Sequence, residues 1–225
     1  MKAFVTGTDT GVGKTHATVL LTRVLRQTGL DTVALKPVCC GDREDAVRLC
    51  ESADGELGLD DINPVWLPLP VSPLVAAEAT GQPLNIDDLL GWFQRVTAGR
   101  QSFFVEGAGG WLVPMAPGLT LADFACALGL PVIVVVANRL GCLNHTLLTV
   151  AAIRAAGLTP LGLVINSVNS IHDDSVKDNR RILEDFTGLP VIAEIAYQQE
   201  AISAAMLRNA STGSAAAETG LPTTK

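Results

Sequence analysis

The residues with the clearest capacity for chemistry are Lys14 and Thr15, which directly follow a glycine-containing loop. The loop runs from Gly7 to Gly13 and joins the apolar residues 3–5 to a segment with helical spacing of apolar residues. In a strand–loop–helix arrangement, backbone N–H groups of the loop wrap phosphate oxygens and the helix end adds partial positive charge. Lys14 would reach the outer phosphates and Thr15 would sit on Mg²⁺. We interpret this stretch as a phosphate-binding P-loop; the alternative is an ordinary β–α turn with a surface lysine.

The spacing of this loop departs from the commonest P-loop. That form has a glycine five residues before the glycine that precedes the lysine, a place that Thr8 occupies in this chain. Gly7 stands one residue earlier, so the loop is longer by one.

Two further charged residues follow apolar segments where strands are expected to end. Lys36 follows the segment 31–35, and Glu106 follows 103–105 and precedes Gly107-Ala108-Gly109-Gly110. Ligand-contacting residues in α/β folds gather at the carboxyl ends of the strands, and in P-loop proteins a second strand supplies an acid that helps to hold Mg²⁺. Lys36 could equally be an exposed strand end, and Glu106 could simply cap a turn.

The remaining pattern indicates a run of β–α units with a mostly parallel central sheet flanked by helices. We expect a proline-rich ordered loop over 60–75, in which Val65, Trp66, Leu67 and Leu69 need burial. A single domain is predicted over 1–207 and a disordered tail over 208–225. Further strands are expected at 31–38, 101–106, 131–137, 161–166 and 190–195, and helices at 42–53, 75–79, 86–97, 121–128, 146–155 and 175–186.

Composition narrows the class of protein. The 225 residues are 48% hydrophobic and carry a net charge of −7, which disfavours nucleic acid and anionic membranes as partners. The longest apolar run, 130–137, is too short to span a bilayer, and the N-terminal segment lacks the pattern of a signal peptide. Five cysteines without metal-ligand spacing indicate reduced thiols. We therefore expect a cytoplasmic protein.

The base of the nucleotide is inferred from two asparagines at predicted strand ends. A GTP-binding protein of this class would carry Asn-Lys-x-Asp or Thr-Lys-x-Asp after a late strand. Asn138-Arg139-Leu140 and Asn166-Ser167-Val168 lack that lysine and aspartate. This favours adenine, although an asparagine at a strand end can also be a turn former.

Together these motifs resemble the dethiobiotin synthetase family of P-loop NTPases over residues 2 to about 200. The most specific matches are the nine residues Gly7–Thr15, then Lys36-Pro37-Val38, then Glu106–Gly110. Val71-Ser72-Pro73 and Gly141–His145 support them. The six-residue spacing from Gly7 to Gly13 is what this family shows.

The resemblance implies a three-layer P-loop fold and an ATP- and Mg²⁺-dependent ring closure. In this family 7,8-diaminononanoate takes up CO₂ as a carbamate, ATP phosphorylates the carbamate to a carbamic–phosphoric anhydride, and the second amine closes the ring of dethiobiotin, with release of ADP and phosphate. The family acts as a homodimer with the active site at the subunit interface.

The resemblance also assigns roles to individual residues. It implies catalytic roles for Lys36, Lys14 and Thr10, and an Mg²⁺ site made by Thr15, Asp45 and Glu106; Glu44 or Asp42 could substitute for Asp45. The implied ATP contacts are Gly11, Val12, Gly13, Lys14, Thr15, His16, Asp45, Glu106, Gly107, Ala108, Gly109, Asn166, Ser167, Ile195, Ala196 and Tyr197. The implied substrate contacts are Thr10, Lys36, Cys40, Gly141, Cys142, Leu143 and Asn144. At position 40 the family usually has a hydroxyl residue.

The main alternative is a partition- or division-type switch ATPase that acts through protein partners. Such proteins place a second lysine early in the P-loop, where this chain has Thr8 and Asp9. Amidating ligases of the same broad group are a second alternative, but they carry a glutaminase domain for which this chain has no room. A nucleotide-binding fold without activity is a third.

Overall fold

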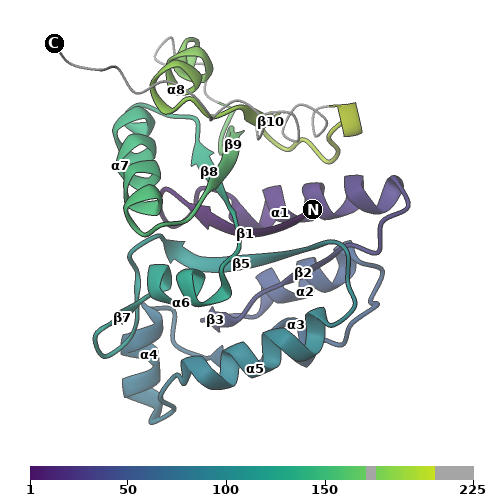
Figure 1. Ribbon diagram of the computed structural model, residues 1–225, viewed down its shortest axis with the longest axis vertical. Coiled ribbons are helices and arrows are strands. Elements are labelled where there is room, and N and C mark those ends of the chain that lie inside the picture. The colour runs from purple at the N-terminus through teal and green to yellow at the C-terminus, as the bar shows by residue number, and fades with distance from the viewer. Residues whose placement is uncertain (171–175, 206–225) are drawn as a thin grey trace, which may run out of the picture.

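The centre of the protein is a six-stranded parallel sheet with the strand order β10-β9-β8-β1-β5-β2 (Figure 1). The computed structural model describes residues 1–170 and 176–205. The sheet contains β1 (Lys2–Gly7), β2 (Val33–Leu35), β5 (Phe103–Gly110), β8 (Val132–Ala137), β9 (Pro160–Asn166) and β10 (Val191–Ile195). Two small two-stranded sheets pair β3 (Val38–Cys40) with β4 (Val65–Leu67), and β6 (Pro114–Ala116) with β7 (Leu119–Thr120).

Helices cover both faces of this sheet, as the sequence pattern predicts for an α/β fold. The helices are α1 (Lys14–Gln27), α2 (Glu44–Ser52), α3 (Leu59–Ile62), α4 (Pro73–Thr80), α5 (Ile86–Thr97), α6 (Leu121–Leu128), α7 (Cys142–Ala155) and α8 (Asn179–Thr187). α1 packs against α2 and against β1 and β5, while α6 contacts β5 and α7 contacts β8 and α8. The expected three-layer P-loop architecture is therefore confirmed.

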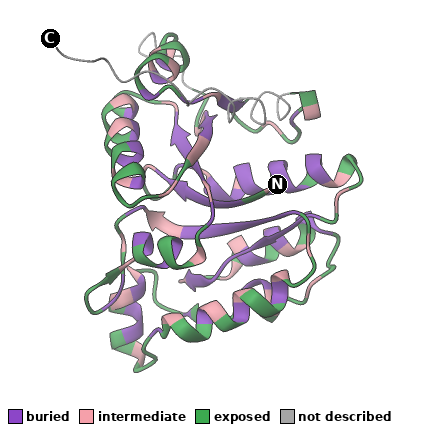
Figure 2. Cartoon of the chain, viewed as in Figure 1, coloured by how far each residue is buried: buried purple, intermediate pink, exposed green. Residues whose placement is uncertain are grey.

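The strands of the central sheet lie almost entirely inside the protein (Figure 2). All six residues of β8 are buried, and β1 is buried from Ala3 onward. A strand covered by helices on both faces reads as a continuous apolar run, which is why 131–137 was recognisable in the sequence. β1 lies between β5 and β8, so the loop that follows β1 emerges at the middle of the sheet edge.

The segment 31–38 does not form one strand. It divides into β2, in the main sheet, and β3, which starts at Val38 and pairs with β4. Lys36 and Pro37 lie between them, and proline lacks the N–H that a continuous ladder needs. The chain therefore changes sheets at Lys36.

The prediction for the proline-rich segment 60–75 was also wrong in part. It contains the strand β4, and of the four side chains expected to be buried, Leu67 is fully buried and Val65 is partly buried. Trp66 and Leu69 are exposed. The indole of Trp66 nevertheless has contacts, because its Nε1 donates to Gly41 O at 2.7 Å and its ring lies under the Arg43 guanidinium.

Some helix starts agree with the sequence signals and others differ from them. α5 begins after Asn85, whose side chain accepts hydrogen bonds from the N–H groups of Asp87 and Asp88, as the N-cap pattern predicts. α2 begins at Glu44 instead of Asp42, α4 at Pro73 instead of Val75, and α7 at Cys142 instead of Thr146. α8 begins at Asn179, and its predicted start at Ser175 lies outside the described residues. The predicted tail, 208–225, lies outside the described residues. Among the described residues, no helix has both the length and the apolar character needed to cross a membrane.

Candidate active site

The loop between β1 and α1 has the backbone of a phosphate-binding loop. Gly11 and Gly13 both have positive φ, of 73° and 85°, a conformation that glycine adopts without steric cost. Gly13 is the N-cap of α1 and provides no side chain to cap it. The first N–H groups of a helix have no partner within the helix, and here no cap side chain competes with an anion for them.

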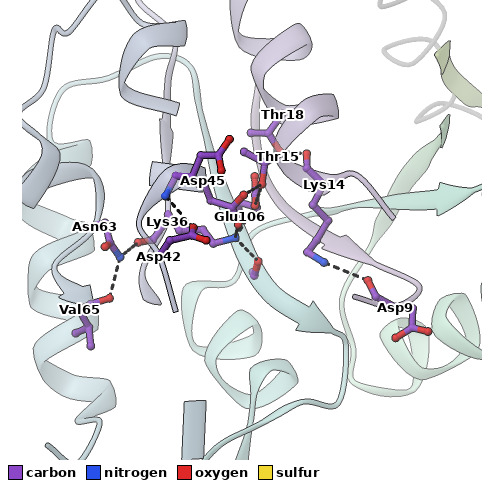
Figure 3. A network of polar contacts seen from close by, with 12 residues as sticks. Asp9, Lys14, Thr15, Thr18, Lys36, Asp42, Asp45, Asn63, Val65 and Glu106 are labelled. Carbon is purple, nitrogen blue, oxygen red and sulfur yellow. Dashed lines mark hydrogen bonds and ion pairs between the residues drawn. The ribbon is translucent and has the colours of Figure 1, made fainter. Parts of the chain in front are cut away.

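Lys14 lies at the start of α1 with its ammonium directed back at the loop (Figure 3). Its Nζ donates to Asp9 O at 3.1 Å, and the side chain is buried. Burial and the nearby charge of Lys36 lower the pKa of Lys14 to about 8. Glu106, Asp45 and Asp9 only partly offset this lowering. A bound phosphate would add negative charge beside Lys14 and would therefore favour its charged form.

Thr15, Asp45 and Glu106 bring three oxygen atoms together beside the loop (Figure 3). Thr15 Oγ1 lies 2.7 Å from Asp45 Oδ1 and 2.8 Å from Glu106 Oε1. Glu106 is fully buried, and its Oε2 has no hydrogen-bond partner among the described residues. A buried carboxylate oxygen without a partner is costly unless a cation or a donor completes the site.

These three residues fit Mg²⁺. Adjacent ligands of an octahedral site with bonds of about 2.0–2.1 Å lie about 2.9 Å apart, close to the separations of Thr15 Oγ1 from the two carboxylates. Mg²⁺ in nucleotide sites usually takes one or two carboxylates together with phosphates and water. Two acids and a hydroxyl are a sufficient protein contribution, although no group of three or more His, Cys, Asp or Glu side chains suited to a metal occurs in the described residues.

Lys36 lies against the same two carboxylates. Its Nζ is 2.6 Å from Glu106 Oε1 and 2.8 Å from Asp45 Oδ2, and it donates to Gly107 O at 3.3 Å. Burial lowers the pKa of Lys36, but Glu106 and Asp45 outweigh that effect and the net pKa is raised. Burial raises the pKa of Asp45, while the Lys36 ammonium lowers it further than burial raises it. Lys36 therefore stays charged and Asp45 stays ionised across the neutral range.

Sequence reasoning missed Asn63, which fixes the backbone of Lys36. The Asn63 amide is almost fully buried and donates to Lys36 O and to Val65 O, both at 2.8 Å. Arg43 Nε donates to Asn63 Oδ1 at 3.0 Å. Asn63 thus ties the end of β2 to the start of β4. The dipeptide Asn63-Pro64 marks a turn in the sequence, but nothing in it indicates a partner 27 residues away.

A cavity of about 670 Å³ opens next to Lys36. Thr10 and Cys40, both expected at the substrate, lie in its wall with Lys36 and Asp45. Burial raises the pKa of the Cys40 thiol, so it is a neutral group. The other lining residues are Val38, Cys39, Asp42, Glu44, Arg48, Pro70, Val71, Ser72, Pro73, Ala108, Gly109 and Val113.

His16 lines a second cavity, which is separate from the cavity beside Lys36. That cavity, of about 650 Å³, is lined by His16, Val19, Leu20, Arg23, Arg48, Glu51, Gln198 and Glu200. Burial and the charge of Arg48 lower the pKa of His16. The neighbouring C-terminal segment contains Ala196 and Tyr197, which the resemblance assigns to ATP, and Tyr197 is exposed.

Asn166 lies at the carboxyl end of β9, where its side chain reaches the P-loop. Its Nδ2 donates to Val12 O at 2.9 Å, although the two residues are 154 positions apart. The next residue, Ser167, is held by its own N–H, which donates to Ile195 O at 2.9 Å. The end of β9 therefore contacts both the P-loop and β10.

The segment Gly141–Asn144 forms the start of α7 and does not line the cavity beside Lys36. Gly141, with φ of 91°, is the N-cap and has no side chain to offer. The preceding Arg139 is 3.8 Å from the Asp9 carboxylate. This ion pair brings the loop before α7 beside the P-loop, but within one chain it does not bring Gly141–Asn144 to Lys36.

Comparison with known proteins identifies close sequence relatives. A model of the family described as AAA domain matches residues 2–205. The ATP-dependent dethiobiotin synthetase BioD of Akkermansia muciniphila is 40% identical over 196 residues, covering 87% of this chain and 92% of the relative. BioD of Anaeromyxobacter sp. (strain Fw109-5) is 40% identical over 201 residues, covering 88% and 90%.

Solved structures with a similar fold are more distant in sequence. The septum site-determining protein MinD of Pyrococcus horikoshii, complexed with Mg-ADP, is 20% identical with a TM-score of 0.57, covering 87% of this chain and 82% of that one. A ParA family ATPase of Chlorobium tepidum is 12% identical with a TM-score of 0.53, covering 94% and 88%. At these identities the likeness shows the fold alone.

Proposed function

Because the chain belongs to the ATP-dependent dethiobiotin synthetase family, we propose that it uses ATP to close the ring of dethiobiotin from 7,8-diaminononanoate and CO₂. Such an enzyme is a carbon–nitrogen cyclo-ligase of biotin biosynthesis. The observation that carries the proposal is the cluster of Lys14, Thr15, Lys36, Asp45 and Glu106 beside a cavity large enough for a small substrate.

The proposed reaction has three steps. One amine of the diamine takes up CO₂ to form a carbamate. A carbamate oxygen then attacks the γ-phosphorus of ATP, which gives a carbamic–phosphoric anhydride and ADP. The second amine attacks the carbonyl carbon of the anhydride, the ureido ring closes, and phosphate leaves.

Phosphoryl transfer depends mainly on position and on neutralising charge. We assign Lys14 and the loop N–H groups of Gly11–Gly13 to the phosphates, with Lys36 placed between phosphate and carbamate. Thr15, Asp45 and Glu106 would hold Mg²⁺, which neutralises charge on the phosphate oxygens when bound. Thr10, in the same cavity wall as Lys36, is assigned to the carbamate.

The distant ends of the substrates are assigned to other parts of the fold. The base of ATP is assigned to Asn166, Ser167 and the segment Ile195–Tyr197, and the phosphates also to Glu106–Gly109. The substrate carboxylate is assigned to Gly141–Asn144 of a second subunit in a homodimer, since these residues lie away from Lys36 within one chain. The five cysteines are free thiols, which supports a cytoplasmic location.

The test is ADP release measured with each component omitted in turn. We expect release to require 7,8-diaminononanoate, bicarbonate and Mg²⁺ together, and dethiobiotin to form in a one-to-one ratio with ADP. ATP turnover that is indifferent to the diamine would contradict the proposal and would favour the switch ATPase. That alternative has the fold in common with this chain, but the relatives at 40% identity are named as synthetases.

A further inference from the structure

We propose that Asn166 is a positioning residue for the phosphate site: its amide holds the Val12–Gly13 peptide group in the orientation that binds phosphate. This inference rests on the proposed function, because it concerns the same nucleotide site. It gives Asn166 a role that does not depend on the base of the nucleotide.

The geometry begins with one buried hydrogen bond. Asn166 is 4% exposed, and its Nδ2 donates to Val12 O at 2.9 Å. The backbone of Asn166 is held in place, because it pairs in the sheet with Ala137 of β8 and with Ile195 of β10. The main-chain carbonyl of Asn166 accepts a hydrogen bond from the main-chain N–H of Asn138 at 2.8 Å. The residue that carries the donor is thus anchored in the sheet, while the acceptor belongs to the loop.

The hydrogen bond sets the direction of a second group. A trans peptide is planar, and its C=O and N–H point in opposite directions. With Val12 O directed at Asn166, the Gly13 N–H points away from Asn166. This is the N–H that directly precedes Lys14, so it belongs to the set that wraps a bound phosphate.

The loop itself does not fix this orientation. A flip of the Val12–Gly13 peptide would change φ of Gly13 from its value of 85° to a negative one, and glycine accepts both signs. A side chain at position 13 could not restrict the choice, since a Cβ there would collide with the amide of Asn166. The contact with Asn166 is therefore what selects one peptide orientation over the other.

The experiment uses a ligand without a base. Magnesium tripolyphosphate and ATP are titrated by calorimetry into the wild-type protein and into the Asn166→Ala variant. We expect the variant to bind tripolyphosphate about tenfold more weakly, as expected when one buried hydrogen bond is lost. Unchanged affinity for tripolyphosphate with weakened ATP binding would overturn the inference and would leave Asn166 as a base contact only.

Asn138→Ala is the matched control. Asn138 follows the neighbouring strand β8, and its Oδ1 accepts a hydrogen bond from Asn179 Nδ2 at 2.9 Å instead of contacting the P-loop. We expect this variant to keep its affinity for tripolyphosphate within about twofold of wild type. An equal loss in both variants would overturn the inference, because it would reflect a general loosening of the sheet edge.

The Asn166→Asp variant tests the direction of the hydrogen bond. Its ionised carboxylate faces Val12 O with no hydrogen to donate, whereas the protonated form can donate. Position 166 is buried, and burial raises the pKa of a carboxyl. The tripolyphosphate affinity of the variant relative to wild type should therefore recover as the pH falls from 8 to 5. A ratio that does not change with pH would contradict the inference. If the wild-type protein bound neither ATP nor tripolyphosphate, the proposed function would fail instead.

Discussion

Lys14 is the residue whose protonation state nucleotide binding is expected to change. Its pKa lies at about 8 in the free protein, because the side chain is buried and Lys36 is close. At pH 8.5 a group with that pKa is about 76% neutral, whereas at pH 7 it is about 9% neutral. A bound triphosphate favours the charged form, so the pKa of Lys14 should rise well above 9 on binding.

Binding should therefore take up protons from solution, in an amount set by pH. We expect an uptake of about 0.8 proton per ATP at pH 8.5 and about 0.1 at pH 7. The uptake is measured by calorimetric titration of Mg-ATP in several buffers of different ionisation enthalpy. The slope of observed enthalpy against ionisation enthalpy gives the number of protons.

The Lys14→Met variant is the control, since it should abolish the uptake at pH 8.5. The same pKa predicts a direction for stability. Lys14 in the folded protein holds fewer protons than in the unfolded chain between pH 8 and its ordinary pKa of 10.5, so its contribution to stability increases as the pH rises through that window. No uptake at pH 8.5 in the wild-type protein would refute the assignment of Lys14 to the phosphates.

Three further substitutions test the rest of the site. Lys36→Met should abolish dethiobiotin formation and largely spare ATP binding, since it removes the cation assigned to the carbamate; an unchanged rate of ring closure would exclude Lys36 from the chemistry. Glu106→Gln should weaken Mn²⁺ binding in the presence of ATP by about tenfold or more, followed by electron paramagnetic resonance, because one of two charged ligands is lost. Equal Mn²⁺ affinity would place the metal elsewhere. Cys40→Ser should lower the KM for the diamine with little change in kcat, because a hydroxyl donates a stronger hydrogen bond than a thiol; an unchanged KM would show that position 40 does not contact the substrate.

The fold and the grouping of the central candidate residues could be predicted because their signals are local. The P-loop lies within nine consecutive residues, and buried parallel strands such as 132–137 are continuous apolar runs. Glu106 was found because it stands between such a strand and a glycine loop. The strand predicted to end there continues to Gly110, since glycines without side chains can still form ladder hydrogen bonds.

The errors arose where a contact between distant segments decides the structure. Trp66 was expected to be buried as an apolar residue, but an indole can remain half exposed when its N–H finds a carbonyl, here Gly41 O. Asn63 was not recognised because its partner, Lys36 O, lies 27 residues away, in the link between β2 and β3. Local periodicity contains no information about such pairs.

Asn138 and Asn166 show the same limit inside the site itself. Each follows a buried parallel strand, so the local strand-end pattern does not distinguish them, and only the family resemblance assigns one of them, Asn166, to ATP. The structure separates them by their partners: the amide of Asn138 accepts from Asn179 of α8, while the amide of Asn166 donates to the P-loop. β8 lies beside β1 and β9 lies one strand further out, so position in the sheet alone would have favoured Asn138 as the P-loop contact. The direction in which each amide points determines which asparagine contacts the P-loop. That direction depends on neighbouring residues in α8 and in the loop after β1. A residue type at a strand end therefore identifies a candidate, and the element packed against it determines its role.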